Sequence, residues 1–224
     1  MLAIIKRSDV SNMKKVHKME LIAKNISFKY PSAKKYLLQD VNLELDNKKI
    51  MGLIGDSGSG KSTLCKILSG YVTKFQGEVI FDGKPLPKKG FKPVQLIYQH
   101  PEKVMNPKWR MKQVLEESWN VQDEDLAQFG IQKSWLTRFP QELSGGELQR
   151  FSVLRSLNPN TKFLIADEMT TMLDAITQAQ ILDTVLKIVK DRKMGFLLVS
   201  HDMDLVDTIC DDKIYLKDIN AAMK

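Results

Sequence analysis

A glycine-rich loop between an apolar run and a helical pattern constrains the fold of this chain more than any other feature. Residues 50–54 are mostly apolar, and the apolar residues of 61–70 recur with helical spacing. The loop between them consists of Gly55, Asp56, Ser57, Gly58, Ser59, Gly60, Lys61, Ser62 and Thr63. This is the strand–GxxxxGK[ST]–helix arrangement of a phosphate-binding loop. The sequence therefore predicts a nucleotide-binding α/β core.

The residue types of this loop suit the binding of a phosphorylated ligand. Glycines allow the backbone N–H groups to turn inward around the β- and γ-phosphates, and the following helix adds its positive N-terminus. We expect Lys61 to bridge the phosphates and the Ser62 hydroxyl to ligate Mg²⁺. The alternative, a glycine/serine-rich turn with an incidental lysine, does not explain the flanking strand and helix.

The rest of the chain reads as alternating strands and helices after an antiparallel start. Residues 20–30 and 41–54 have strand patterns, with a turn at Asp46-Asn47. Further strands are expected near 79–81, 95–98, 162–167, 195–200 and 213–216, and helices at 61–70, 112–119, 123–129, 144–157, 175–192 and 203–210. The predicted fold class is α/β with an N-terminal antiparallel β portion and a helical insertion over about 100–158.

Length and hydropathy favour one globular unit. Residues 19–224 read as a single domain, whereas 1–18 lack clear periodicity and are either a loosely ordered extension or the result of an early start codon. No run of about 18 apolar residues is present, so no membrane span is predicted. The two cysteines, Cys65 and Cys210, lack the company of metal ligands, and we interpret them as reduced core thiols.

The net charge of +7 raises the question of nucleic acid. The lysines are scattered through loops as pairs, and no basic face is interleaved with aromatic residues. A basic surface beside a nucleotide site, or one facing anionic lipid headgroups, accounts for the charge at least as well. We therefore expect no nucleic-acid partner.

Two adjacent carboxylates follow the apolar run at 163–166. Neighbouring side chains on a strand point to opposite faces, so Asp167 and Glu168 cannot serve the same role. We expect Asp167 to hold Mg²⁺ and Glu168 to polarise the water that attacks the γ-phosphate. A charged strand terminus at the surface is the alternative. His201 follows the run at 195–200 and is a candidate to contact the γ-phosphate, although such a histidine is often only a structural residue.

The segment Leu143-Ser144-Gly145-Gly146-Glu147 precedes a helix and has the chemistry of a second anion site. Ser144 is a good N-cap, and Gly145 and Gly146 allow backbone N–H groups to approach a phosphate. This segment closely resembles the signature sequence of ABC ATPases. The resemblance covers roughly residues 20–217, with the motifs in family order, and implies that two such domains sandwich two ATP molecules head to tail.

Other residues acquire expected roles from this resemblance. Tyr30 matches the aromatic that stacks on adenine, although it could instead be a tyrosine packed on the core. Gln99 matches the glutamine that senses the γ-phosphate and Mg²⁺. Asp174 matches the aspartate that crosses the dimer interface, and His201 the switch histidine. The implied catalytic set is Glu168, His201, Lys61 and Gln99, and the implied Mg²⁺ ligands are Ser62, Gln99 and Asp167.

The segment from Gln99 to Pro107 and the residues Phe139 to Leu143 resemble the ATPases of the oligopeptide, dipeptide and nickel uptake group. The resemblance implies a bacterial importer for peptides or for a metal or metal chelate. It also implies a second ATPase subunit, more often a different chain, two permease subunits, and an extracytoplasmic binding protein that acts indirectly. The protein would lie on the cytoplasmic face of the cell membrane, with the permease docked after Gln99.

Three departures and three alternatives accompany this interpretation. Glu147 stands where glutamine is common, the interface loop reads Thr-Met-Leu-Asp, and the chain ends at Lys224, before the longer tail usual in this group. One alternative is a soluble ABC ATPase of a multi-enzyme complex, such as the phosphonate-breakdown type. The others are a nucleic-acid- or ribosome-associated ABC protein, which normally carries two modules, and a binding module without chemistry, which the intact Glu168 opposes.

Overall fold

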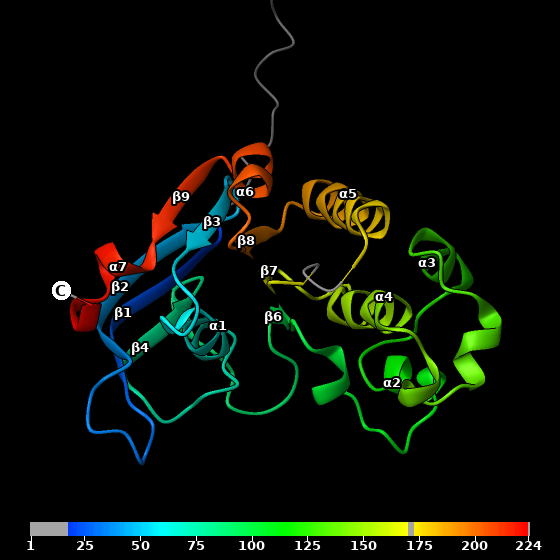
Figure 1. The fold of residues 1–224 in the computed structure, drawn as a ribbon, viewed down its shortest axis with the longest axis horizontal. Coiled ribbons are helices and arrows are strands. Elements are labelled where there is room, and N and C mark those ends of the chain that lie inside the picture. Colours follow the sequence, from blue (N-terminus) through cyan, green and yellow to red (C-terminus); the bar gives the residue numbers. More distant parts are fainter. Residues whose placement is uncertain (1–17, 170–172, 224) are drawn as a thin grey trace, which may run out of the picture.

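The strands of the computed structural model form two sheets, one antiparallel and one parallel (Figure 1). The structure describes residues 18–169 and 173–223, so the prediction for the N-terminal segment lies almost wholly outside the described residues. The strands are β1 (Glu20–Phe28), β2 (Leu38–Asp46), β3 (Ile50–Ile54), β4 (Gln76–Phe81), β5 (Lys84–Pro85), β6 (Val94–Ile97), β7 (Phe163–Asp167), β8 (Gly195–Val199) and β9 (Asp212–Tyr215).

Strand order confirms the predicted α/β class. The antiparallel sheet has the order β2-β1-β4-β5, and the other sheet has the order β6-β7-β8-β3-β9 with every neighbouring pair parallel. In a parallel sheet all strands run the same way, so their carboxyl ends lie at one edge. The loops that carry the predicted site residues leave from that edge.

The helices cover the parallel sheet and fill the long connection between β6 and β7. They are α1 (Lys61–Leu68), α2 (Met111–Glu116), α3 (Asp123–Gln128), α4 (Gly145–Ser156), α5 (Ala175–Asp191), α6 (Met203–Ile209) and α7 (Leu216–Ile219). Residues 98–162, all described, contain helices and turns but no strand, and α2, α3 and α4 lie together on one side of the molecule (Figure 1).

Alternate residues of the buried strands pack into two separate cores. Phe163 and Ile165 join a core with α1 and the antiparallel sheet, whereas Leu164 and Ala166 join a core with α2, α4 and α5. All four are fully buried. This is why the central strands read as continuous apolar runs rather than as an alternating pattern.

Several boundaries differ from the sequence prediction. Strand β2 begins at Leu38 rather than at residue 41. Strand β9 ends at Tyr215, because Leu216 starts α7 and is fully buried in the core formed with α1 and the antiparallel sheet. Cys210 directly follows α6 and is half-buried against the core formed with α2, α4 and α5, so the predicted core thiol is fully buried only at Cys65. Among the residues described, no helix is long and apolar enough to cross a membrane.

Candidate functional site

The glycine-rich loop closes over the start of α1, and its lysine is held inside it. Lys61 is buried, and its Nζ donates to the carbonyl oxygens of Gly55, at 2.6 Å, and Asp56, at 2.9 Å. A phosphate oxygen is a better acceptor for an ammonium group than two neutral carbonyls. The lysine is therefore positioned to transfer these hydrogen bonds to a bound phosphate.

Glycine is required at position 60 for two reasons. Its φ of 108° lies in the left-handed region, which L side chains rarely adopt. A Cβ there would lie 3.0 Å from Leu38 Cδ2 and 3.2 Å from Leu37 Cγ.

The buried Ser59 hydroxyl has no hydrogen-bond partner among the described residues. The loop thus keeps a buried polar group unsatisfied beside its backbone, as expected of a cradle for a polar ligand.

Asp167 is a buried carboxylate with an unsatisfied oxygen. It is 4% exposed, and its Oδ1 has no hydrogen-bond partner among the described residues. Burial raises the pKa of this carboxyl, while the nearby Ser62 hydroxyl and Lys61 act in the opposite direction. A buried, unpaired carboxylate oxygen is costly unless it binds a cation or a donor. Asp167 and Ser62 therefore fit the requirements of a Mg²⁺ site.

The oxygen chemistry of this site suits Mg²⁺ more than a transition metal. No group of three or more histidine, cysteine, aspartate or glutamate side chains that could hold a metal occurs in residues 18–169 or 173–223. Mg²⁺ is commonly held by one or two protein oxygens together with substrate phosphates and water. The set Ser62, Asp167 and Gln99 fits that pattern, with the remaining ligands supplied by a nucleotide.

Glu168 stands apart from Asp167 for a reason that differs from the predicted one. Strand β7 ends at Asp167, and Glu168 has a φ of 49°, in the left-handed region. The two acids are thus separated by a change of backbone conformation rather than by strand alternation. A non-glycine residue held in this region is strained, and such strain concentrates at functional sites.

Gln99 and His201 both contact the Glu168 carboxylate, whereas the roles predicted for them toward the γ-phosphate and Mg²⁺ stay predictions. The Gln99 Nε2 donates to Glu168 Oε2 at 2.9 Å, and His201 Nδ1 lies 3.4 Å from Glu168 Oε1. The three residues leave the carboxyl ends of β6, β7 and β8. A carboxylate held on both oxygens keeps one orientation, and that suits a group that must align a water molecule.

The signature segment caps a helix with its own side chains. Ser144 Oγ accepts from the Glu147 N–H at 3.3 Å, and Glu147 Oε2 accepts from the Ser144 N–H at 2.8 Å. This reciprocal capping box explains why glutamate serves at position 147. Gly145 has no atom within 4 Å of its Cβ position, so the start of α4 is open to an incoming group.

The remaining predicted residues occupy separate places around the loop. Tyr30 lies beyond the end of β1, is 50% exposed, and its hydroxyl lies 3.1 Å from Thr63 Oγ1 in α1. Asp174 caps α5, accepting from the Thr177 N–H at 2.9 Å, and this hydrogen bond lowers the pKa of Asp174. The exposed ring of Tyr30 is available for stacking, and Asp174 has a structural role that the sequence prediction did not include.

A cavity of about 620 Å³ joins the loop to the strand ends. It is lined by Ile54, Gly55, Asp56, Ser57, Lys61, Glu168, His201, Met203, Tyr215, Lys217 and Met223. Sequence reasoning gave no site role to the last four: Met203 and Tyr215 fell within a predicted helix and strand, and Lys217 and Met223 within neither. Tyr215 ends a parallel strand and could have been found by that rule. Of the predicted site residues, those that do not line this cavity are Tyr30, Gly58, Ser59, Gly60, Ser62, Thr63, Gln99, Asp167, Asp174 and residues 144–147.

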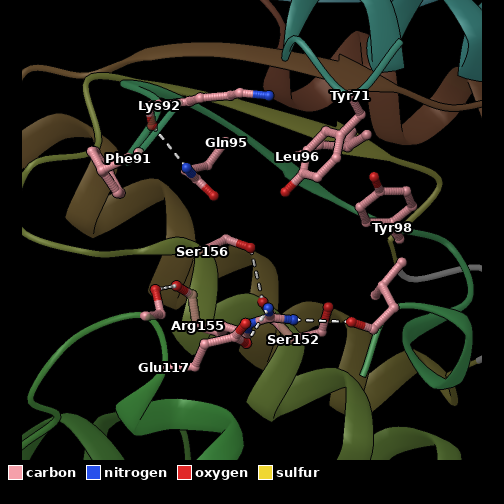
Figure 2. Close-up of a pocket in the computed structure, with 13 residues that line it drawn as sticks. Tyr71, Phe91, Lys92, Gln95, Leu96, Tyr98, Glu117, Ser152, Arg155 and Ser156 are labelled. Atoms are coloured by element: carbon pink, nitrogen blue, oxygen red, sulfur yellow. Dashed lines mark hydrogen bonds and ion pairs between the residues drawn. The ribbon is translucent and has the colours of Figure 1, made fainter. Parts of the chain in front are cut away.

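A second cavity, of about 440 Å³, lies between β6 and the far half of α4 (Figure 2). The rings of Tyr71 and Tyr98 meet edge to face with centroids 5.5 Å apart. Arg155 bonds the Glu117 carboxylate at 2.7 Å and the Val104 carbonyl at 3.1 Å. Burial raises the pKa of the Tyr98 hydroxyl, with the neighbouring Tyr71 acting in the same direction. This cavity is aromatic and polar and contains no member of the predicted catalytic set.

Comparison with known proteins agrees with this geometry. The ABC transporter family model matches residues 38–171. The nickel import system ATP-binding protein NikE of Staphylococcus aureus is 33% identical in strain bovine RF122 / ET3-1 and 32% in strain USA300. Each alignment is 209 residues long and covers 87% of this chain and 85% of that protein.

Two solved structures share the fold. A dimeric ATP-binding cassette in a post-hydrolysis state, bound to ADP and Pi, has a TM-score of 0.73 and 24% identity, covering 88% of this chain and 94% of its own. The protein cbiO1 of Clostridium perfringens, part of the ABC transporter complex cbiONQ, has a TM-score of 0.69 and 22% identity, covering 87% and 83%.

Proposed function

This chain belongs to the ABC transporter family as an ATP-hydrolysing, ATP-binding subunit, and from that premise we propose that it powers a bacterial importer of nickel or a nickel chelate. The choice of nickel is supported by the named function of the Staphylococcus aureus relatives. The sequence resemblance also allows a peptide importer, and the experiment below distinguishes the two substrates.

The observation that carries the catalytic part of the proposal is the pairing of two unlike carboxylates beside the phosphate loop. Asp167 has a buried oxygen without a hydrogen-bond partner among the described residues, whereas Glu168 is held on both oxygens by Gln99 and His201. The first suits a cation and the second suits a water molecule.

In the proposed mechanism, ATP enters the loop and Lys61 exchanges its two carbonyl acceptors for phosphate oxygens. Ser62, Asp167 and Gln99 would hold Mg²⁺, which supplies charge neutralisation on the β- and γ-phosphates when bound. Tyr30 stacks on the adenine. Glu168 orients the attacking water and accepts its proton, and His201 holds the water and the γ-phosphate in place.

The site requires a partner subunit for its other half. The start of α4 is open at Gly145, and none of residues 144–147 lines the phosphate-loop cavity of the same chain. We propose that a second ABC ATPase subunit places its own signature segment over the ATP bound here. This chain places Ser144, Gly145 and Gly146 over the partner's ATP, with the loop around Asp174 crossing between the two subunits.

The second cavity is the proposed docking site of a permease subunit (Figure 2). Tyr71 and Phe91 are exposed at its mouth, and exposed aromatic residues are typical of protein interfaces. The cavity adjoins the catalytic site through the backbone, since Tyr98 precedes Gln99. Helix α4 contributes Ser152 and Arg155, and Gln149 of the same helix donates to the Tyr98 carbonyl at 3.4 Å. Movement of a docked segment would thereby reach Gln99.

Membrane association tests this proposal directly. The chain is tagged in its native cell, membranes are solubilised gently, and the proteins that co-purify are identified. Recovery of a second ABC ATPase and two permease subunits is the expected result, and the identity of the permeases distinguishes nickel from peptide transport. Recovery of soluble enzymes alone would contradict the transport role while leaving the ATPase chemistry intact.

A double variant tests the permease contact in the same preparation. Replacing Tyr71 and Phe91 together by serine should reduce recovery of the permeases, because both rings line the mouth of the docking cavity. Binding of a fluorescent ATP analogue should be retained, since neither ring lines the nucleotide cavity. Undiminished recovery of the permeases would move the docking site elsewhere.

A further inference from the structure

An isoleucine stands almost fully exposed in the first turn of α5. Ile176 is 72% exposed, more than any other large hydrophobic residue that the described ranges contain. The next are Tyr71 and Tyr30, at 52% and 50%; Tyr71 lines the second cavity, and the Tyr30 hydroxyl contacts Thr63. Single exposed apolar residues are common and need no explanation by themselves. The position of Ile176 relative to the signature segment gives it significance.

The turn that carries Ile176 lies beside the start of α4. A Cβ at Gly146 would lie 3.6 Å from Leu173 Cδ2 and 3.8 Å from Thr177 Cγ2, so this turn is close to the second signature glycine. Asp174 fixes the turn by capping α5. Ile176 is therefore a rigidly held apolar side chain beside the segment proposed to cover the partner's ATP.

Three exposed apolar side chains lie on the opposite half of the same site. Met203, Tyr215 and Met223 are 37%, 37% and 40% exposed, and all three line the cavity that contains Gly55, Asp56 and Ser57 of the phosphate loop. We call these three side chains the apolar wall. They are separated in the sequence, and their meeting in one cavity is a product of the fold.

The end of the apolar wall is fixed in place by a buried asparagine. Asn220 is fully buried, accepts from the Gln39 N–H at 2.9 Å, and donates to the Leu37 carbonyl at 2.9 Å. These bonds hold the segment with Met223 against β2. A wall supported in this way loses little conformational freedom when another surface packs on it, which favours binding.

Head-to-tail pairing brings these two surfaces together. When the signature segment of one subunit covers the phosphate loop of the other, the side chain beside the signature meets the cavity beside the loop. We propose that Ile176 is an apolar anchor of the subunit pair, packing against the apolar wall beside the phosphate loop of a partner ABC subunit built in the same way. By the twofold relation, the apolar wall of this chain receives the corresponding aliphatic side chain of the partner.

This inference rests on the proposed pairing with a second ABC subunit and identifies an apolar contact within it, beside the phosphate loop. It also gives a physical reason for four exposed apolar residues: each would be covered when the site is complete. Anchors of this kind contribute most when they fill a desolvated recess, while the surrounding contacts contribute little.

Photo-cross-linking in the native membrane complex tests the contact. Ile176 is replaced by p-benzoylphenylalanine in the full-length tagged chain, membranes are irradiated with ATP and Mg²⁺, and the cross-linked peptides are identified by mass spectrometry. The expected product joins position 176 to an ABC subunit within the partner's counterpart of residues 201–203 or 215–223. The same photoprobe at Lys187, an exposed position in the last part of α5, is the matched control and should give no such product.

Cross-links from position 176 to a permease, or to another part of the ABC partner, would overturn the proposal. So would the absence of any cross-link in a preparation where the second ABC subunit co-purifies. If no second ABC subunit co-purifies, the pairing itself fails and with it the proposed function, so the two failures are distinguishable.

A pair of substitutions gives a second readout. Ile176→Ser should weaken ATP-dependent recovery of the ABC partner by about tenfold or more, the loss expected when an isoleucine no longer buries its side chain. Ile176→Leu, which keeps an aliphatic side chain, should restore recovery. Binding of a fluorescent ATP analogue to the separated subunit should stay unchanged in both. Equal recovery with serine and leucine would show that position 176 does not anchor the pair.

Discussion

Replacing Asp167 by asparagine should stabilise the nucleotide-free protein while removing its response to Mg²⁺ and nucleotide. The Asp167 carboxylate is 4% exposed, and its Oδ1 has no hydrogen-bond partner among the described residues. Burial of the ionised carboxylate is costly, and asparagine removes this charge while keeping one acceptor oxygen at the same place. Part of this cost is offset in the native protein by Ser62 and by the charge of Lys61. We therefore expect asparagine to raise the free energy of unfolding by about 1 kcal/mol.

The pH dependence of this gain has a definite sign. Burial raises the folded-state pKa of Asp167 above its ordinary value of 3.8. An acid whose folded pKa is raised destabilises the folded state only where it is ionised, so the penalty is absent below the unfolded pKa. It grows as the pH rises through the folded pKa. Asparagine is neutral at every pH, so its advantage should be largest at neutral pH and should vanish at about pH 4.

Thermal unfolding measures both effects in one protein preparation. Without nucleotide, the midpoint should rise by about 2–4 °C for a chain of this size. With Mg²⁺ and a non-hydrolysable ATP analogue at about 100 times its Kd, the native protein should gain about 2.7 kcal/mol. The variant should gain much less, so the order of stability inverts.

Asp183→Asn is the matched control, because it changes an exposed carboxylate paired with Lys187 and should alter stability by less than about 0.5 kcal/mol. A nucleotide-free Asp167→Asn protein less stable than the native one would refute the reasoning. In that case the carboxylate would be a structural acceptor rather than an unfilled metal ligand.

Three further predictions concern residues at and away from the site. Glu168→Gln should retain nucleotide binding but lower turnover by about 10²- to 10⁴-fold, because the amide can keep the contacts to Gln99 and His201 but cannot accept a proton. Steady-state phosphate release measures this, and unchanged turnover would show that Glu168 is not the base. Ser144→Ala should lower the free energy of unfolding by about 1 kcal/mol, because it removes the side-chain cap of α4. Urea unfolding of the separated subunit measures this, and an unchanged free energy of unfolding would show that the cap does not stabilise the helix. Burial raises the pKa of the Cys210 thiol to about 11. In a folded Cys65→Ser variant, where Cys210 is the thiol that remains, labelling should be slow at pH 8 and accelerate towards pH 11. Fast labelling at pH 8 would show that the thiol is more exposed than the fold indicates.

The fold was predictable where a local pattern determines it. The strand, loop and helix at residues 50–70 were predictable, because a phosphate-binding loop explains the glycines, the lysine and the flanking elements together. The apolar runs before Asp167 and His201 predicted buried parallel strands, and the structure places Phe163 and Leu164 in two different cores. Continuous apolar sequence was informative because both faces of the sheet are covered.

The parts of the site that sequence reasoning missed depend on tertiary contacts. Met203, Tyr215 and Met223 meet at the phosphate loop only because the last strand pairs with β3 and Asn220 holds the C-terminal segment against β2. The backbone change at Glu168 was also missed, since left-handed glutamate has no sequence signal. The roles of Tyr30 and Asp174 at a subunit interface remain predictions, because they concern a partner.

Transport by the reconstituted complex tests the central claim most directly. The native complex is purified through this chain, placed in proteoliposomes with ATP and Mg²⁺ on the side of the ATPase, and the accumulation of radioactive nickel is followed, with a dipeptide as the comparison substrate. The account predicts ATP-dependent nickel accumulation by the native complex and almost none by Glu168→Gln at equal protein content. Equal accumulation by the two complexes, or ATP hydrolysis without movement of either substrate, would contradict it.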